Sequence, residues 1–120
     1  MTHVVKRLYR EEMELQKIFS NCRLIRYEKC NYNYFNNYDN YKIEIYTDYK
    51  LFRIEFNNYY PFRAPVMYIN DKNYLDMLTI KMPELKDRCL CCESLLCNLN
   101  WSPKKKVIDL INEYYKNKKI

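Results

Sequence analysis

Hydrophobic residues recur at helical spacing near the start of the chain. Val5, Leu8, Leu15 and Phe19 fall near one stripe when the residues are placed on a helix, and charged residues fall on the opposite side. A stripe of this kind is typical of an amphipathic helix that buries one face. Threonine is a residue type that caps helix starts, so Thr2 suits the position before the first turn. We predict an amphipathic helix from Thr2 to about Phe19.

The central part of the chain alternates between apolar and polar residues. Ile43 and Ile45 alternate with charged residues, and so do the apolar residues between Phe52 and Phe56. A period of two is that of antiparallel strands with one buried face. We predict a meander of about four strands, comprising residues 22–29, the two alternating stretches joined by a hairpin at 47–50, and a short strand from Val66 to Ile69.

Two stretches show no regular period. Residues 31–40 are dense in Asn and Tyr and are predicted to form a loop, whereas residues 70–92 contain Pro83 and are predicted to be irregular. Beyond them, Ser102 and Pro103 suit an N-cap and a first-turn proline of a last helix. Apolar residues then recur at helical spacing, at Val107, Leu110, Ile111 and Tyr114. The element order predicts an α+β fold.

Size and composition favour one folded domain. A chain of 120 residues has the length of a single domain, 1–120, and 48% hydrophobic residues are too many for a disordered protein. No apolar run approaches the ~18 residues of a membrane span, and the start lacks the apolar segment of a secretory signal. We therefore expect no membrane partner and a cytoplasmic or nuclear location. Because the chain has no glycine, its tight turns must use Asn, Asp or Pro.

The net charge of +6 is diluted among 15 acidic residues. Such a balance predicts weak attraction to acidic partners at low salt, without naming one. The lysines at 104–106 and near the C-terminus are interpreted as a solvated surface, because base stacking would need exposed aromatic side chains beside them. We expect no specific nucleic-acid partner.

Four of the six cysteines crowd into one short segment. In a reducing compartment such residues are thiols, metal ligands or a nucleophile more often than disulfides. Cys89, Cys91, Cys92 and Cys97 supply four sulfurs within nine residues, so a zinc site is one alternative. Adjacent Cys91 and Cys92 suit a tetrahedral site poorly, the paired Cys-x-x-Cys spacing is missing and His3 is the only histidine. We expect no metal and no cofactor, with the four-cysteine site as the less favoured reading.

Three local patterns, in this order along the chain, resemble the ubiquitin-conjugating enzyme family. The start of the first predicted helix, Lys6-Arg7-Leu8-Tyr9-Arg10-Glu11-Glu12, is similar to the opening helix of the family. The segment Tyr60-Pro61-Phe62 resembles its Tyr-Pro-Phe stretch, and Trp101-Ser102-Pro103 its Trp-Ser-Pro stretch. The resemblance extends from the first helix to about Tyr115 and implies the family's α+β core, without the two further helices that usually follow.

The resemblance also implies a chemistry and a set of partners. The family's nucleophilic cysteine lies eight or nine residues before the tryptophan, which puts it at Cys92, nine residues before Trp101, with Cys91 as the alternative. Such a cysteine carries ubiquitin or a ubiquitin-like protein as a thioester, which it receives from an activating enzyme and passes to a lysine or a ligase. Residues that correspond to the family's partner-binding positions are Lys6, Arg7, Arg10, Phe62, Ser102 and Pro103.

Two departures from the family pattern keep a second function open. In register with the family, the catalytic asparagine falls on Met77, and the approach to Cys92 is longer, with an insertion around residues 70–88. Asn70, Asn73 or Asn98 could substitute for the asparagine. The alternative is a catalytically inactive variant that binds ubiquitin or a ligase. The many Asn, Lys and Tyr codons of an AT-rich genome would suit a viral or parasitic source.

Overall fold

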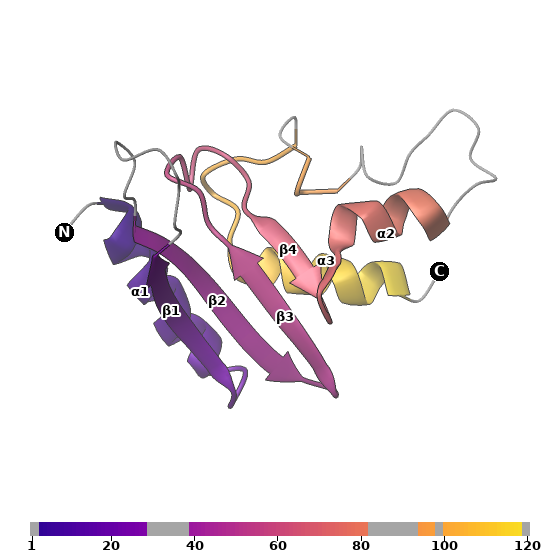
Figure 1. Cartoon of the computed structure of the whole chain (residues 1–120), viewed down its shortest axis with the longest axis horizontal. Coiled ribbons are helices and arrows are strands. Elements are labelled where there is room, and N and C mark those ends of the chain that lie inside the picture. The colour runs from indigo at the N-terminus through magenta and orange to yellow at the C-terminus, as the bar shows by residue number, and fades with distance from the viewer. Residues whose placement is uncertain (1–2, 29–38, 82–93, 98–99, 119–120) are drawn as a thin grey trace.

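The computed structural model describes residues 3–28, 39–81, 94–97 and 100–118, which form an α+β fold (Figure 1). An N-terminal helix, a five-stranded antiparallel sheet and a C-terminal helix confirm the predicted fold class. The elements in chain order are α1 (His3–Gln16), β1 (Cys22–Glu28), β2 (Asp39–Thr47), β3 (Lys50–Glu55), β4 (Val66–Ile69), β5 (Lys72–Asn73), α2 (Tyr74–Lys81) and α3 (Val107–Lys118).

The sheet is a simple meander in which each strand pairs with the next along the chain. Two of its connections are two-residue turns whose residues have positive φ, Asp48 and Tyr49 at 53° and 58°, and Asn70 and Asp71 at 50° and 67°. Such turns match the twist of the strands they join. Three of the four positions carry the Asn or Asp expected in a chain without glycine, and Tyr49 is the exception.

One face of the sheet forms the core, together with the two long helices. Figure 1 shows α1 lying behind β1 and β2, and α3 lying behind β3 and β4. Antiparallel pairing brings Ile43, Ile54 and Met67 into one row of this face. The fully buried side chains of this core come from both long helices and from the sheet: Leu8, Leu15, Ile43, Ile45, Phe52, Ile54, Met67, Val107, Leu110 and Ile111. Each such side chain contributes about 1.5–3 kcal/mol by its burial.

The prediction of an irregular segment over residues 70–92 is wrong for Lys72–Lys81, which form β5 and α2. Asn73 begins the helix, since its side-chain oxygen accepts the backbone N–H of Asp76 at 3.3 Å. Tyr74 and Leu78 are buried, and Leu75 and Met77 also pack against the core. A helix that is apolar on several sides shows no clear period of 3.6, which explains why the sequence pattern missed it.

The last helix begins later than predicted. Ser102 and Pro103 precede α3 by several residues, and the helix starts at Val107. The N–H of Lys106 donates to the Asp109 carboxylate at 2.9 Å, which satisfies a backbone group at the helix start. The N–H of Val107 donates to Glu11 of α1 at 2.8 Å. The first helix likewise ends at Gln16, three residues before the predicted Phe19.

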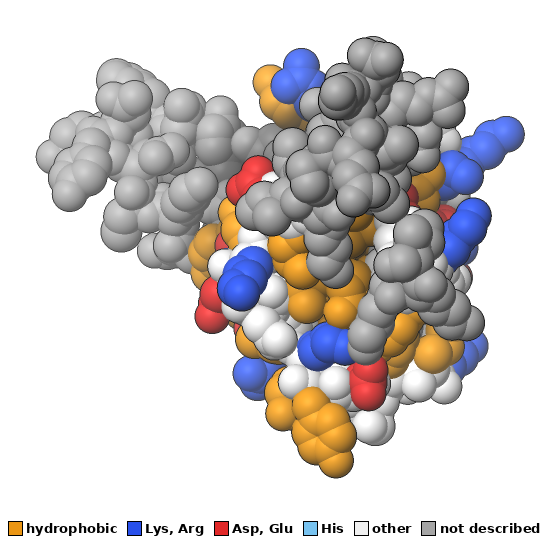
Figure 2. Space-filling view, turned by 90° about the vertical axis from the view of Figure 1, so that its right-hand side faces the viewer, with side chains coloured by type: hydrophobic (Ala, Val, Ile, Leu, Met, Phe, Trp, Pro, Cys, Tyr) orange, Lys and Arg blue, Asp and Glu red, His pale blue; other side chains and the backbone are white. Residues whose placement is uncertain are grey.

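Hydrophobic side chains gather at the centre of the face that lies at the right-hand end of Figure 1 (Figure 2). Lys and Arg side chains lie around them, toward the rim of that view. The partly buried residues that pack against the core include Leu75 and Met77 of α2 and Tyr115 of α3. The core therefore reaches this end of the molecule through both helices.

None of the helices in the described part of the chain is long and apolar enough to cross a membrane. The 14 residues of α1 and the 12 of α3 fall short of the ~20 that a spanning helix needs.

Candidate functional site

Two loops that lie 40 residues apart in sequence meet at the end of the sheet. The indole N–H of Trp101 donates to the carbonyl oxygen of Pro61 at 2.7 Å, and the rings of Trp101 and Tyr60 lie 6.0 Å apart. The Tyr60–Pro61 peptide bond is cis. We call residues 59–63 and 101–104 together the two-loop surface.

Apolar side chains stand out from the two-loop surface. Phe62 is 78% exposed and Tyr59 is 60% exposed, and Pro103 is exposed beside the second loop. The guanidinium of Arg63 lies over the Tyr59 ring at 4.5 Å. Large exposed apolar side chains that gather in one place are typical of protein–protein contacts.

A buried carboxylate joins the two-loop surface to both long helices. Glu11 of α1 is only 3% exposed, and its oxygens accept the N–H of Val107 at 2.8 Å and the Nε–H of Arg7 at 3.3 Å. The same carboxylate accepts the hydroxyl of Tyr60. Burial and the neighbouring Glu11 carboxylate raise the pKa of Tyr60 well above its usual range. This phenol therefore stays protonated and remains a donor.

Arg7 contributes a second set of links at the same junction. Its guanidinium donates to the carbonyl oxygens of Pro103 and Lys105 and lies 5.1 Å from the centre of the Tyr60 ring. Arg7 is thus engaged within the protein, at the position where the sequence resemblance implies partner binding. All three of its guanidinium nitrogens have a partner within the chain, and the side chain is 22% exposed.

The other partner-binding residues predicted from the sequence differ in exposure. Lys6 and Arg10 are exposed on α1, and Phe62 and Pro103 are exposed on the two loops. Ser102 is half-buried, and its carbonyl oxygen accepts the N–H of Lys105 at 3.0 Å. The structure therefore brings Arg7, Phe62, Ser102 and Pro103 to one junction.

The segment 94–97, which follows the candidate nucleophile in sequence, is held by α3. Glu113 accepts the Ser94 hydroxyl and the Leu95 N–H, both at 2.7 Å. Asn100 donates from its amide to the Ser94 carbonyl oxygen at 3.1 Å. Trp101 donates its backbone N–H to the carbonyl oxygen of Cys97 at 3.1 Å, so this turn leads directly into the second loop.

The candidate nucleophile Cys92 and its alternative Cys91 lie outside the described residues, and so does Cys89. Cys97, the fourth sulfur of the alternative zinc site, is a half-buried free thiol. Within the described ranges, no three His, Cys, Asp or Glu side chains come together in a way that could hold a metal ion. With three of its four sulfurs outside these ranges, the zinc alternative is untested.

Met77, at the position of the family's asparagine, and two of the asparagines that could substitute for it make contacts within the fold. Met77 lies on α2, half-buried against the core. The side-chain oxygen of Asn70 accepts the N–H of Leu51 at 3.0 Å, and that of Asn73 starts α2. Asn98 lies outside the described residues. Two of the three possible substitutes therefore already use their amide oxygen to hold the backbone.

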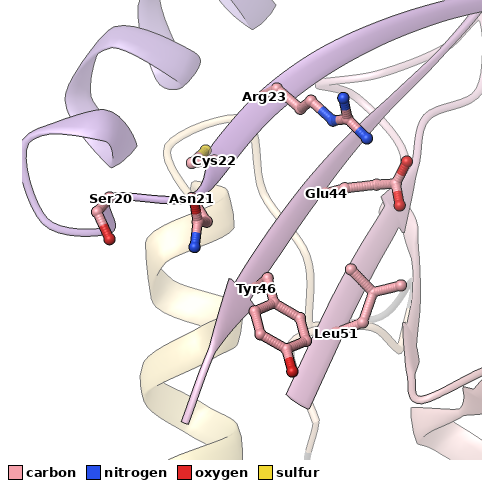
Figure 3. Close-up of a pocket in the computed structure, with 7 residues that line it drawn as sticks. All are labelled: Ser20, Asn21, Cys22, Arg23, Glu44, Tyr46 and Leu51. Atoms are coloured by element: carbon pink, nitrogen blue, oxygen red, sulfur yellow. The ribbon is translucent and has the colours of Figure 1, made fainter. Parts of the chain in front are cut away.

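A shallow hollow of about 410 Å³ lies where β1 begins, near the β2–β3 hairpin (Figure 3). Arg23, Glu44, Tyr46 and Leu51 contribute to it from three neighbouring strands. Burial, and then the charge of Glu12, raises the pKa of the adjoining thiol of Cys22 to about 11. A thiol in that state is a poor nucleophile at neutral pH.

The sequence predictions assigned no role to Glu11 or Glu113. A signal was present, because Glu11 falls on the stripe of Leu8 and Leu15, and Glu113 lies three residues after Leu110. A carboxylate on the buried stripe of an amphipathic helix must find donors there, since an unpaired buried charge is costly. Which donors it finds depends on contacts that are distant in sequence.

Comparisons of the chain with protein-family models, with curated proteins and with solved structures found no match.

Proposed function

We propose that this chain is a ubiquitin-conjugating-type protein, which accepts ubiquitin or a ubiquitin-like protein as a thioester on Cys92. The observation that carries the proposal is the hydrogen bond between Trp101 and Pro61. It joins the Tyr-Pro-Phe and Trp-Ser-Pro segments, the two most specific points of resemblance to that family, into one surface. A chance match in two separate segments would have no reason to meet in space.

The proposed chemistry is an acyl transfer in two steps. The Cys92 thiolate attacks the thioester carbonyl carbon of the modifier, a new C–S bond forms, and the cysteine of the activating enzyme leaves as a thiolate. A lysine amine then attacks the same carbon, a C–N bond forms, the C–S bond to Cys92 breaks, and the amine releases a proton to solvent. A ligase with its own cysteine would instead take the acyl group as a thioester.

The two-loop surface is the proposed docking site for a ubiquitin ligase, with Phe62 and Pro103 as its apolar contacts. Lys6, Arg7 and Arg10 of α1 are the residues proposed to meet the activating enzyme. Residues 59–65 and 100–106 contain no acidic residue, whereas Arg63 and Lys104 are exposed. An apolar centre with a basic rim suits a partner that carries acidic residues around an apolar contact. These partners would place the protein in the cytoplasm or the nucleus.

Thioester formation tests the proposal directly. The purified chain is incubated with activating enzyme, ATP and ubiquitin or a ubiquitin-like protein, and the products are separated on a non-reducing gel. We expect an adduct that disappears on addition of a thiol and in Cys92→Ala, and that persists in the matched variant Cys91→Ala. Loss of the adduct in Cys91→Ala alone would move the nucleophile to Cys91.

The second candidate is a catalytically inactive variant of the same fold that binds ubiquitin or a ligase. It is favoured by Met77, which packs on the core from α2 and has no side-chain N–H to donate. Loss of one positioned oxyanion donor costs about 10²–10³ in rate in well-studied enzymes, so lysine transfer would be slow at best. If no modifier forms an adduct but the chain still binds a ligase domain through Phe62, this second function is the correct one.

A further inference from the structure

We propose that Glu11 is the positioning residue of the two-loop surface, whose buried carboxylate sets the orientation in which Phe62 and Pro103 meet a partner. The inference rests on the proposed function, because it concerns the same docking site. Glu11 itself does not touch the partner, since only 3% of it is exposed. It acts through the groups that it holds.

The first support is the set of donors that converge on this carboxylate. Tyr60 belongs to the first loop, and Val107 begins α3 shortly after the second loop. Arg7 donates to Glu11 and reaches from α1 to the carbonyl oxygens of Pro103 and Lys105, in and just beyond that second loop. All of these groups donate hydrogen bonds, so an ionised carboxylate satisfies them together. One side chain therefore links three segments that are distant in sequence.

The second support is the position of Phe62 relative to its anchor. Tyr60 is fully buried, and Phe62, two residues later, is 78% exposed. The backbone between them is short, and its Pro61 carbonyl is held by Trp101. The N–H of Arg63 also donates to the Tyr59 carbonyl oxygen at 3.2 Å, which closes the loop into a turn. A displacement of the Tyr60 ring is therefore passed on to Phe62.

The third support is the contrast among the glutamates of α1. The carboxylate of Glu12 accepts the N–H of Leu24 in β1, and Glu14 pairs with Lys106 at 3.2 Å where both side chains are 45% exposed. Glu11 is the glutamate of α1 that contacts the hydroxyl of the first loop. The adjacent Glu12 thus provides a control with the same chemistry and a different target.

The test compares Glu11→Gln with Glu12→Gln in the full chain. Glutamine has the same shape but presents an amide NH₂ to donors that need an acceptor, so it breaks part of the Glu11 junction. Two readouts are measured where each variant is fully folded. They are the hydrogen exchange of the Phe62 and Arg63 amides, and the affinity for isolated RING domains of ubiquitin ligases.

We expect Glu11→Gln to speed exchange of the two amides about tenfold and to weaken RING-domain binding by a similar factor, as loss of one hydrogen bond to a charged group would do. Glu12→Gln should leave both unchanged. Tyr60→Phe, which removes only the hydroxyl, should change both in the same direction as Glu11→Gln. If Glu11→Gln is too unstable, Tyr60→Phe carries the comparison.

Equal amide exchange in Glu11→Gln, Tyr60→Phe and the wild type would overturn the inference, whatever the partner. A purely stabilising role would lower the unfolding temperature of Glu11→Gln while leaving amide exchange and affinity in the folded protein unchanged. Failure of the proposed function has a different signature: the wild type and Phe62→Ala would then bind RING domains equally poorly. The amide exchange would still decide the role of Glu11.

Discussion

Glu11 and Glu113 perform the same task at two places and differ in their surroundings. Each carboxylate accepts a hydroxyl and a backbone N–H, from Tyr60 and Val107 in the first case and from Ser94 and Leu95 in the second. Glu11 is 3% exposed and also accepts from a guanidinium, whereas Glu113 is half-buried.

The difference shows what a buried carboxylate needs. Removal from water costs several kcal/mol for an ion, and neutral donors alone rarely compensate for it. At Glu11 the guanidinium of Arg7 supplies the opposite charge, and the same guanidinium extends the junction to the second loop. Glu113 is only half-buried, so neutral donors are enough there. The contacts around Glu11 should therefore be rigid and sensitive to substitution, whereas those around Glu113 should tolerate substitution better.

The largest expected effect is that of Glu11→Ala. It leaves the Nε–H of Arg7, the Tyr60 hydroxyl and the Val107 N–H without their acceptor, and removing one partner of a largely buried pair costs about 3–5 kcal/mol. Urea unfolding followed by Trp101 fluorescence measures the loss. Glu14→Ala is the matched control on the same helix, because its exposed pair with Lys106 is worth at most ~1 kcal/mol. Equal losses in the two variants would contradict the rigid contacts around Glu11.

Glu113→Ala should cost less, about 1–3 kcal/mol, because the Ser94 hydroxyl and the Leu95 N–H lose an acceptor that is only half-buried. The same unfolding experiment gives the value. The half-buried thiol of Cys97 adds a local readout, since loosening of the 94–97 turn should raise its rate of alkylation. A loss as large as that of Glu11→Ala would remove the distinction between the two carboxylates.

Tyr60→Phe should cost about 1.5–3 kcal/mol at neutral pH, the value of one hydrogen bond to a charged group. The variant also changes the pH dependence. Burial and Glu11 raise the pKa of Tyr60 above its ordinary 10.0, so the folded state keeps a proton that the unfolded state releases. Stability from this group is complete below pH 10 and decreases as the pH rises through the folded value. Tyr60→Phe should show a smaller alkaline decrease in unfolding titrations, and an identical decrease would contradict this contact.

The smallest expected effect is that of a substitution in the β2–β3 turn, away from Glu11 and Glu113. Tyr49 is 92% exposed and has a φ of 58°, a conformation that costs a residue with a large side chain about 1–2 kcal/mol and suits asparagine better. Tyr49→Asn should therefore raise the free energy of unfolding by about 0.5–1 kcal/mol. The control is Tyr46→Asn in the adjacent strand, where asparagine has lower β propensity and should destabilise. A destabilising Tyr49→Asn would show that the ring contributes contacts of its own.

Elements with one buried face and one exposed face could be predicted from the sequence. Ile43 and Ile54 alternate with charged residues because the other face of the sheet meets water, and the resulting period is readable. Tyr74, Leu75, Met77 and Leu78 of the helix at 74–81 all pack against the core, so the segment has no clear period and the helix was missed. The two loops were found through their motifs, but not the junction that joins them. Tyr60 and Val107 lie 49 and 96 residues from Glu11, and no local pattern carries such distances.

The contacts between α1 and β1 have a further consequence, for the association of copies of the chain. β1 is the first strand of the sheet, so its outer backbone groups would offer a template for a strand from another molecule. Glu12 accepts the N–H of Leu24, and Gln16 donates to the Cys22 carbonyl oxygen at 3.1 Å. Both backbone groups point away from β2, because alternate residues of an antiparallel strand bond to each side. The first helix thus occupies outward backbone groups in the first half of β1, where a strand from another molecule would otherwise pair.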